Sequence, residues 1–391
     1  MGETSVDSRT ERAATAPRSG NGSRSGAGGR GAAGGRAPPR RGGRGSLTRA
    51  SAGASRKPLW IDCDAGVDDI HALMVAMAHV HGPRNGAGGP PASLEAVSVV
   101  DGNIGVRQGV ANVRRCLRLS PRAVDVLPGA EEPILGRTVP SDEYFGKDGL
   151  GDCPDLPPAL RPGDLGGGGG RGGGHAALRL VERAREMPGE LVVVCLGPLT
   201  NLALACLVCP ELPELLAEVH VMGGAVAAGN VTPHAEFNFY FDAVAADLVL
   251  RKFVDVRLYT WDLAKEATVP WPQWDRVAGL DAPVARFATG IAGKALAGAD
   301  RGRTSGYVIC DPLCVVGALE PASLTLGSPK RARVVVQGDA LGKLVIEGEC
   351  AGGAGAGGRG SVFVVEHVDP GAVVRRFCDA TSNAGEWARQ S

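Results

Sequence analysis

The chain has 391 residues, of which 59 are Gly and 27 are Pro, and its 42 basic and 42 acidic residues give a formal net charge of zero. This length allows one large domain or two ordinary ones, and the balanced charge gives no argument for nucleic acid or an anionic membrane as a partner. The balance hides a split, because residues 1–57 carry twelve Lys or Arg against three acidic residues, which leaves the rest of the chain acidic.

Residues 1–57 form a basic tail that is rich in Gly, Arg and Ser and contains no aromatic residue. Such a segment cannot bury enough apolar surface to offset its ordering entropy, so we predict that it is disordered. Its composition weakly resembles an organelle transit peptide, which makes a plastid or mitochondrion the alternative to a cytoplasmic location. No hydrophobic signal segment opens the chain, so the ten cysteines are expected to be reduced.

Residues 58–391 alternate short apolar runs with helical stretches, which is typical of an α/β domain with a mostly parallel central sheet flanked by helices. We therefore predict a single domain with a Rossmann-like open sheet. Strands are expected at 59–63, 94–100, 191–196, 219–222 and 256–259, and more weakly within 331–367. Helices are expected at 69–79, 106–117, 176–186, 199–207 and 243–251. Gly-rich segments without a period are expected to be surface insertions, near 82–93, 163–174 and 351–360.

The first predicted strand runs into a cluster of aspartates and then directly into a helix; the cluster is Asp62, Asp64, Asp68 and Asp69. Four carboxylates in eight residues repel one another, and they are tolerated where a divalent cation neutralises them. Oxygen ligands favour calcium or magnesium over zinc. Because open α/β sheets bind their ligands at the carboxyl ends of the strands, this position predicts a metal-containing active site.

Four other functional motifs fail on their own requirements. An EF-hand loop that began at Asp62 would need Gly and Glu where Val67 and Leu73 stand. A Gly-x-Gly-x-x-Gly match lies inside the glycine run at 163–174 rather than between a strand and a helix. No Walker-type loop and no Gly-x-Ser-x-Gly elbow is present in the sequence, which removes the main support for NTPases and serine hydrolases.

The sequence Asp-Cys-Asp-Ala-Gly-Val-Asp-Asp at 62–69 resembles the amino-terminal signature of the inosine-uridine preferring nucleoside hydrolases. The resemblance continues in order through further motifs: Asp101-Gly102-Asn103, Gly197-Pro198-Leu199-Thr200-Asn201, Val221-Met222-Gly223-Gly224, Gly229-Asn230, Ala235-Glu236-Phe237-Asn238 and Asp311-Pro312. Ordered matches over some 250 residues are specific, and they cover about 58–320 well and the remainder weakly.

The resemblance implies a calcium ion held by Asp64, Asp69, the backbone carbonyl of Leu196 and Asp311. It also implies hydrolysis of the N-glycosidic bond of a ribonucleoside, with Asp64 as the base that deprotonates the attacking water. This chemistry is sensible in itself, because a metal lowers the pKa of water and a nearby carboxylate can take the proton.

The remaining site residues are also carried over from the family pattern. Five of them match positions that hydrogen-bond the ribose: Asp68, Asn103, Asn230, Glu236 and Asn238. Met222 matches a position beside the ribose, and Phe145 matches one near the base that often holds His. Cys310 stands where many members carry the His that protonates the departing base, and a thiol is a poorer acid for that task. We keep Cys310 as a candidate catalytic residue, with leaving-group protonation open.

Structural interpretations compete at several of these positions. Asn201 follows a turn and is interpreted as a helix cap. Glu236 and Asn238 alternate with Phe237 and Phe239, as on a strand with one polar and one apolar face. The loop at 298–307 lies where the family has a mobile flap, and Trp261 or Trp271 are candidates to stack on the base.

The sequence thus predicts a calcium-dependent ribonucleoside hydrolase of nucleoside salvage or catabolism, acting on purine or pyrimidine ribonucleosides as a homo-oligomer, a dimer or tetramer. Two alternatives stay open at this point. One is a catalytically silent protein that binds ribose or nucleosides on the same fold. The other is a metal-dependent phosphohydrolase, which would need a Lys or Arg near the strand ends to hold phosphate.

Overall fold

The fold is described from a computed structural model that covers residues 56–82, 89–136, 143–159, 174–350 and 360–382. The predicted tail lies outside the described residues apart from its last two positions, of which Lys57 already belongs to the first strand. The predicted insertions at 163–174 and 351–360 lie outside as well, except for their last residues. The insertion predicted near 82–93 extends too far, because Ala92 and Ser93 lie in a strand.

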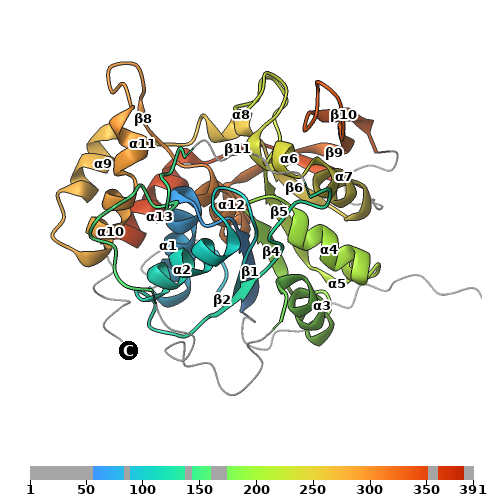
Figure 1. The fold of residues 1–391 in the computed structure, drawn as a ribbon, viewed down its shortest axis with the longest axis horizontal. Coiled ribbons are helices and arrows are strands. Elements are labelled where there is room, and N and C mark those ends of the chain that lie inside the picture. Colours follow the sequence, from blue (N-terminus) through green and yellow to red (C-terminus); the bar gives the residue numbers. More distant parts are fainter. Residues whose placement is uncertain (1–55, 83–88, 137–142, 160–173, 351–359, 383–391) are drawn as a thin grey trace, which may run out of the picture. The chain divides into compact units, whose positions relative to one another are not determined.

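A nine-stranded sheet organises residues 51–391, which group into one compact unit (Figure 1). Its strands, from one edge to the other, are β10 (Leu344–Glu349), β9 (Leu324–Val334), β11 (Val362–Val368), β6 (Val256–Tyr259), β5 (Glu218–Met222), β4 (Val192–Cys195), β1 (Lys57–Cys63), β2 (Ala92–Val99) and β3 (Asp125–Pro128). The seven strands from β11 to β3 pair in parallel, and β9 and β10 add an antiparallel edge. The prediction of a mostly parallel α/β sheet is confirmed.

Helices cover both faces of this sheet (Figure 1). One face carries α1 (Val67–His81), α2 (Val106–Leu117), α9 (Trp271–Ala278), α10 (Pro283–Ile291), α12 (Asp311–Leu319) and α13 (Pro370–Ser382). The other carries α3 (Ala176–Glu186), α4 (Thr200–Val208), α5 (Leu212–Leu215) and α7 (Ala243–Lys252). Short elements complete the described chain: α6 (Phe237–Phe241), α8 (Trp261–Ala264), α11 (Gly293–Ala297), the 3-10 helix η2 (Pro321–Ser323) and a two-stranded ribbon of β7 (Thr268–Pro270) and β8 (Gly306–Val308).

The central strand β1 shows how the sequence builds two cores. Leu59 and Ile61 belong to the apolar cluster under α1, whereas Trp60 belongs to the cluster under α3 and α4. Successive side chains of a strand point to opposite faces, so a run that is apolar throughout fits a strand covered on both sides. Asp62 follows on the same face as Trp60, and the burial of a charged group there calls for specific partners.

The connection of β1 defines where a ligand site is expected. The chain passes from β1 to β2 on one side, and later returns to β4 on the other side of β1. The carboxyl end of β1 is therefore a switch point of the topology, where ligands bind in open α/β sheets. The residues that follow β1 and β4, Asp64 and Leu196, meet at this point.

The strand-like alternation at 236–239, kept as a competing interpretation, does not correspond to a strand. Glu236 caps the N-terminus of α6 and Asn238 lies in its first turn. The reason is local, because the Glu236 carboxylate accepts the backbone N–H groups of Asn238 and Phe239 at 2.8 and 3.2 Å and so begins a helix.

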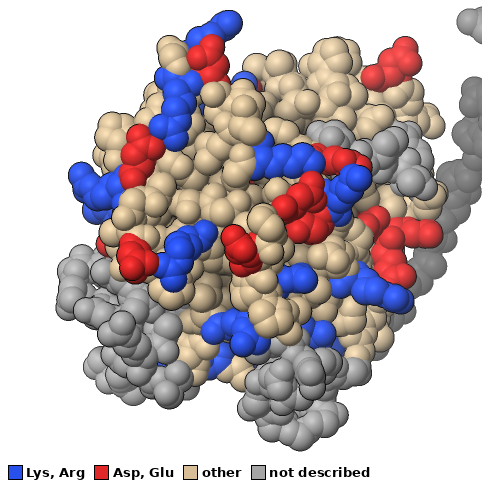
Figure 2. Space-filling view, turned by 60° about the vertical axis from the view of Figure 1, so that its left-hand side comes forward, with Lys and Arg blue, Asp and Glu red and all other residues tan. Residues whose placement is uncertain are grey.

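Several charged groups on the surface of the described chain lie in pairs of opposite sign. Arg301 contacts Asp275 at 2.9 Å and Arg185 contacts Glu211 at 2.7 Å, and Figure 2 shows basic and acidic side chains next to one another on one face. Among the described residues, none of the helices is both long and apolar enough to cross a membrane.

Candidate active site

The turn between β1 and α1 folds the aspartate cluster onto itself. The Asp69 carboxylate accepts the backbone N–H of Gly66 at 2.9 Å and that of Asp64 at 3.2 Å. Between them Ala65 has a φ of 59°, a left-handed conformation that costs a non-glycine residue free energy. The turn is thus fixed by one of its own carboxylates, and the backbone reversal places Asp64 and Asp69 side by side.

Asp64 is enclosed by backbone from two neighbouring strand ends. Its Oδ2 accepts the backbone N–H of Asn103 at 2.7 Å. A Cβ at Gly102 would overlap the Asp64 carboxyl group, and one at Gly197 would lie 2.9 Å from its Cβ. Because only glycine lets the backbone approach so closely, these two glycines fix the orientation of Asp64.

Asp68, Asp69 and Asp311 each offer a carboxylate oxygen to one point, with these atoms within 4.8 Å of one another. Asp311 lies in the first turn of α12, where the helix dipole favours a negative charge. Burial is the main cause that raises the pKa of all three, to about 7 for Asp68 and well above the usual range for the other two, and the charge of Asp64 adds to it for each of them.

The donor set suits a hard cation. Burial also raises the pKa of Asp64, which adds a fourth crowded carboxylate, and the Oδ1 atom of Asp68 is buried without a hydrogen-bond partner. A divalent cation would neutralise this cluster and supply the missing partner. The carbonyl of Leu196, next to Asp64, accepts the Asn238 side-chain amide at 2.7 Å and has a second lone pair left for a metal.

A second group of polar side chains gathers at the start of α6. Glu236 accepts the backbone N–H of Gly224 at 2.7 Å, and Asn230 accepts that of Phe237 at 2.9 Å. The Asn238 amide reaches the carbonyls of both Leu196 and Met222, at 2.7 and 3.2 Å. Burial raises the pKa of Glu236 to about 7. These hydrogen bonds hold Glu236 and Asn238 in place at the carboxyl ends of β4 and β5.

Apolar and aromatic side chains also line the site. Phe145 packs against Gly66, where an added Cβ would lie 2.9 Å from its ring, and Tyr144 stacks edge-on against Phe145 with ring centroids 4.8 Å apart. Burial, with the nearby carboxylates, raises the pKa of the Cys310 thiol well above its usual range. Cys310 is therefore a neutral thiol at physiological pH rather than a thiolate nucleophile.

These groups surround one cavity of about 380 Å³, a size typical of small-molecule sites. Every site residue predicted from the sequence lines it except Asp69, which lies behind Asp64 in the turn: Asp64, Asp68, Asn103, Phe145, Leu196, Met222, Asn230, Glu236, Asn238, Cys310 and Asp311. Trp261 lines it as expected for a base-stacking residue, but Trp271 does not, because its indole N–H donates to the Thr304 carbonyl at 2.8 Å instead.

Four lining residues were not predicted from the sequence, namely Tyr144, Val231, Phe237 and Val308, and a fifth, Tyr307, was predicted only as the end of the flap loop at 298–307. Each is a direct neighbour of, or lies within three residues of, a predicted site residue. Their apolar character gave no chemical signal, but position next to a motif could have marked them. Tyr307 comes from β8 and belongs to an aromatic cluster with His71 and Trp274, at centroid distances of 5.9 and 4.6 Å.

Asp62 lies in β1, two residues before Asp64, and does not line the cavity. Its Oδ1 accepts the hydroxyl of Ser98 and, at 2.8 Å, the side-chain amide of Asn201, while burial raises its pKa to about 7. The Asn201 oxygen in turn accepts the backbone N–H of Ala130 at 2.8 Å. The interpretation of Asn201 as a helix cap is therefore wrong, since Asn201 lies inside α4 and connects the carboxyl ends of β1 and β3.

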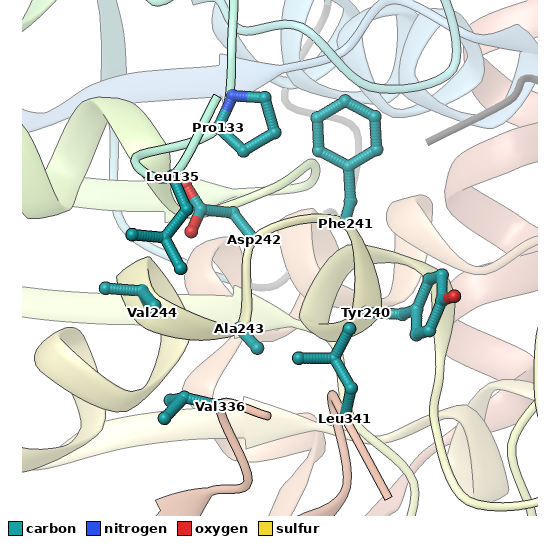
Figure 3. Close-up of a pocket in the computed structure, with 9 residues that line it drawn as sticks. All are labelled: Pro133, Leu135, Tyr240, Phe241, Asp242, Ala243, Val244, Val336 and Leu341. Carbon is teal, nitrogen blue, oxygen red and sulfur yellow. The ribbon is translucent and has the colours of Figure 1, made fainter. Parts of the chain in front are cut away.

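A second hollow lies beside α7 and is too small for a nucleoside, at about 40 Å³ (Figure 3). Its lining is mainly apolar, with Leu135, Val336 and Leu341 among its members. Asp242, the acidic group in Figure 3, is already engaged, because its carboxylate accepts Thr200 Oγ1 at 2.7 Å and the backbone N–H of Ile134 at 2.9 Å.

Comparisons with known proteins identify the family of the chain. Residues 59–375 match the profile of a family described as inosine-uridine preferring nucleoside hydrolase. The pyrimidine-specific ribonucleoside hydrolase RihA of Salmonella typhimurium is 32% identical over 229 residues, 58% of this chain and 67% of that protein. RihA of Escherichia coli O127:H6 is equally similar, with the same shares covered.

Solved structures show the same fold. An inosine-guanosine nucleoside hydrolase superimposes with a TM-score of 0.69 at 26% identity and covers 83% of this chain and 98% of its own. A purine-preferring ribonucleoside hydrolase from Gardnerella vaginalis gives a TM-score of 0.71 at 23% identity, over 86% and 100% of the two chains.

The chain belongs to the inosine-uridine preferring nucleoside hydrolase family. It is accordingly an enzyme that hydrolyses the N-glycosidic bond of ribonucleosides, of a metal-dependent family.

Proposed function

We propose that this enzyme is a calcium-dependent hydrolase of purine or pyrimidine ribonucleosides that releases ribose and free base in nucleoside salvage or catabolism. One observation carries the proposal. A single cavity at the carboxyl ends of β1, β4 and β5 is lined by a carboxylate cluster, by a network of polar side chains and by aromatic side chains. A ribonucleoside has the matching parts: a diol that can ligate a metal, a polar sugar and a planar base.

The proposed calcium ligands are Asp64, Asp69, Asp311 and the Leu196 carbonyl. When bound, calcium would lower the pKa of the attacking water and fix its position. Asp68 is as close to Asp69 and Asp311 as a ligand would be, and its unpartnered oxygen supports a role at the junction between the metal and the ribose hydroxyls. Seven or eight oxygen ligands are usual for calcium, which leaves room for water and for substrate oxygens beside the protein groups.

Asp64 is proposed to take the proton of the water. The bond from Asn103 N–H holds one of its oxygens and leaves the other for this task. Transfer of the proton yields the hydroxyl that attacks the anomeric carbon, as the bond between that carbon and the base nitrogen breaks and its electron pair leaves with the base. A carboxylate at hydrogen-bond distance of the water contributes typically 10²- to 10⁴-fold to such a step.

Ribose recognition is proposed for Asp68, Asn103, Asn230, Glu236 and Asn238, with Met222 beside the sugar. Glu236 and Asn238 are held by backbone bonds before any substrate arrives, so little ordering is needed on binding. A site that pairs each hydroxyl rejects sugars that lack one, because its buried polar groups would be left unpaired.

The base is proposed to lie between Phe145, Trp261 and Cys310, where an aromatic face can stack on it. Cys310 stays protonated and can donate only a weak hydrogen bond to the departing base. A phosphohydrolase is disfavoured by the same cavity, because no Lys or Arg is among the described residues that line it.

The test is release of ribose from inosine, uridine, adenosine, cytidine and xanthosine by the full chain, with calcium and then with an excess of chelator. Release that the chelator stops and calcium restores supports the proposal and ranks the bases. Release that is unaffected by complete metal removal contradicts calcium dependence. Calcium binding and nucleoside binding without release from any of the five would instead indicate a silent binding protein. Size-exclusion chromatography with light scattering tests the proposed dimer or tetramer.

A further inference from the structure

A buried amide in α2 lies between the two loops that form the ends of the substrate cavity. Asn112 is fully buried in the middle of this helix and does not line the cavity. A buried side-chain amide is costly unless its groups are paired, and here they are all engaged. Its oxygen accepts Gln108 Nε2 at 3.0 Å and Arg115 Nη1 at 3.2 Å, both from the same helix.

The nitrogen of Asn112 reaches out of the helix to two separate loops. It donates to the Ala65 carbonyl at 3.3 Å and to the Asp148 carbonyl at 2.7 Å. Ala65 is the residue with positive φ in the turn that carries Asp64 and Asp69. Asp148 belongs to the segment that carries Tyr144 and Phe145. One NH₂ group thus binds the metal end and the base end of the site.

The segment from Phe145 to Asp152 is rigid enough to transmit this tie. The Gly151 N–H donates to the Phe145 carbonyl at 2.7 Å and closes the loop. Inside it the Asp148 carboxylate accepts the Leu150 and Asp152 N–H groups at 2.8 and 3.0 Å, and Asp152 accepts the Lys147 N–H at 2.7 Å. A loop with this many internal bonds moves as a unit, so holding the Asp148 carbonyl also fixes where Phe145 stands.

The turn at 62–69 and the loop at 144–152 also contact each other directly. Phe145 packs on Gly66, the residue after Ala65, and Gly149 has so little space that an added Cβ would lie 3.2 Å from the Asn112 nitrogen. The two loops are therefore linked both by direct packing and by the hydrogen bonds of the Asn112 amide. Either loop can shift only if the Asn112 bonds or the Phe145 contact adjust with it.

We infer that Asn112 is a positioning residue that couples the order of the metal-binding turn at 62–69 to that of the base-side loop at 144–152. Binding of a metal at Asp64 and Asp69 stiffens the turn around Ala65, and through the Asn112 amide this also stiffens the loop that holds Phe145. The base side of the site is then organised before a nucleoside arrives. The metal part of this inference rests on the proposed calcium site.

The test is hydrogen exchange of backbone amides, measured by mass spectrometry with calcium alone as the ligand. Asn112→Asp keeps the size and the acceptor oxygens of the residue but removes both donors, and Asn112→Leu removes all polar groups. The matched control is Gln108→Met, which removes a partner of the Asn112 oxygen and leaves the two donors intact. Circular dichroism and thermal unfolding verify that each variant is folded, and Asn112→Asp decides the matter if Asn112→Leu does not fold.

In the wild-type chain and in Gln108→Met we expect saturating calcium to slow exchange in both 62–69 and 144–152. In Asn112→Asp calcium slows exchange in 62–69 only, and the amides of 144–152 exchange on the order of 10-fold faster than in the wild type even without metal. With substrate, the variant should show a raised KM for ribonucleosides and a smaller change in kcat, because the base wall rather than the water-activating group is loosened.

Two results would overturn the inference: calcium protection of 144–152 that persists in Asn112→Asp, or metal-free exchange in that loop that does not accelerate. If the wild-type chain binds no calcium, the proposed cofactor fails, while the metal-free comparison of Asn112→Asp with Gln108→Met still decides whether the tie exists.

Discussion

Replacement of Asp64 by Asn tests the proposed base most directly. The side chain keeps its shape, and its remaining oxygen can still accept the Asn103 N–H that now bonds Asp64 at 2.7 Å. What disappears is the charge that would bind calcium and take a proton from water. Loss of a positioned base costs about 10²- to 10⁴-fold, which corresponds to about 3–5 kcal/mol in transition-state stabilisation. Asp64→Asn should therefore lower kcat by at least 100-fold.

The measurement is steady-state ribose release at saturating calcium, combined with calorimetric titration of calcium into the variant. Asp101→Asn is the matched control, because Asp101 lies close enough to Asp64 for their charges to interact but does not line the cavity. It removes the same charge from the same region without removing a proposed ligand or base. If Asp64→Asn, with calcium bound, retains kcat within fivefold of the control, Asp64 is not the base.

Three further expectations follow from the geometry. Gly102→Ala would push a methyl group into the Asp64 carboxyl group, and a displacement of about 1 Å costs roughly 100-fold in rate. The control Gly293→Ala, which has open space around it, should leave the rate unchanged. Equal rates of ribose release for the two variants would refute the close approach. Cys310→His should increase kcat for inosine by a factor about tenfold larger than the factor for p-nitrophenyl riboside, whose leaving group needs no proton. An equal increase for both substrates would mean that Cys310 does not lie beside the base. Burial lowers the pKa of His220 to about 4, so this group stays neutral in the folded chain while the unfolded chain takes up a proton below about pH 6.5. Its contribution to stability is complete above pH 6.5 and is lost as the pH falls toward 4, by about 2 kcal/mol between pH 7 and 5; urea unfolding of wild type and His220→Gln at both pH values checks this, and an identical pH dependence of the two would contradict it.

The centre of the sheet could be predicted because β1, β4 and β5 are almost fully buried and read as short apolar runs. Strand β6 and helices α2 and α3 have the expected bounds, and the other predicted elements begin or end within two residues of their prediction. The competing strand interpretation at Glu236 and Asn238 fails because the pattern there is too short. Alternation of polar and apolar residues over four positions cannot distinguish a strand from a cap and first helical turn, and the hydrogen bonds of Glu236 decided the outcome.

The polar part of the site could be predicted because its motifs carry chemistry. Carboxylates after a strand and asparagines after glycines are recognisable one at a time, and family resemblance orders them. The aromatic wall could not, because residues such as Tyr307 come from a ribbon, β7 with β8, that packs against α9, which follows β7 directly, and against α13 far along the chain. Sequence gives no hint of which apolar side chains face a cavity and which fill a core.

Asn112 and Asn201 show a third kind of residue that sequence reasoning misses. Both are buried amides within helices, where an Asn side chain is unfavourable unless it is hydrogen-bonded. Neither of them lines the cavity. Each instead satisfies carbonyl, carboxylate or N–H groups of segments more than 30 residues away. An active site with four crowded carboxylates repels itself, so its geometry before metal binding must be held by groups outside it. The two amides supply that restraint from opposite faces of the sheet: Asn201 through Asp62 and Ala130, and Asn112 through Ala65 and Asp148. Replacement of either amide should therefore lower metal affinity more than it lowers the free energy of unfolding.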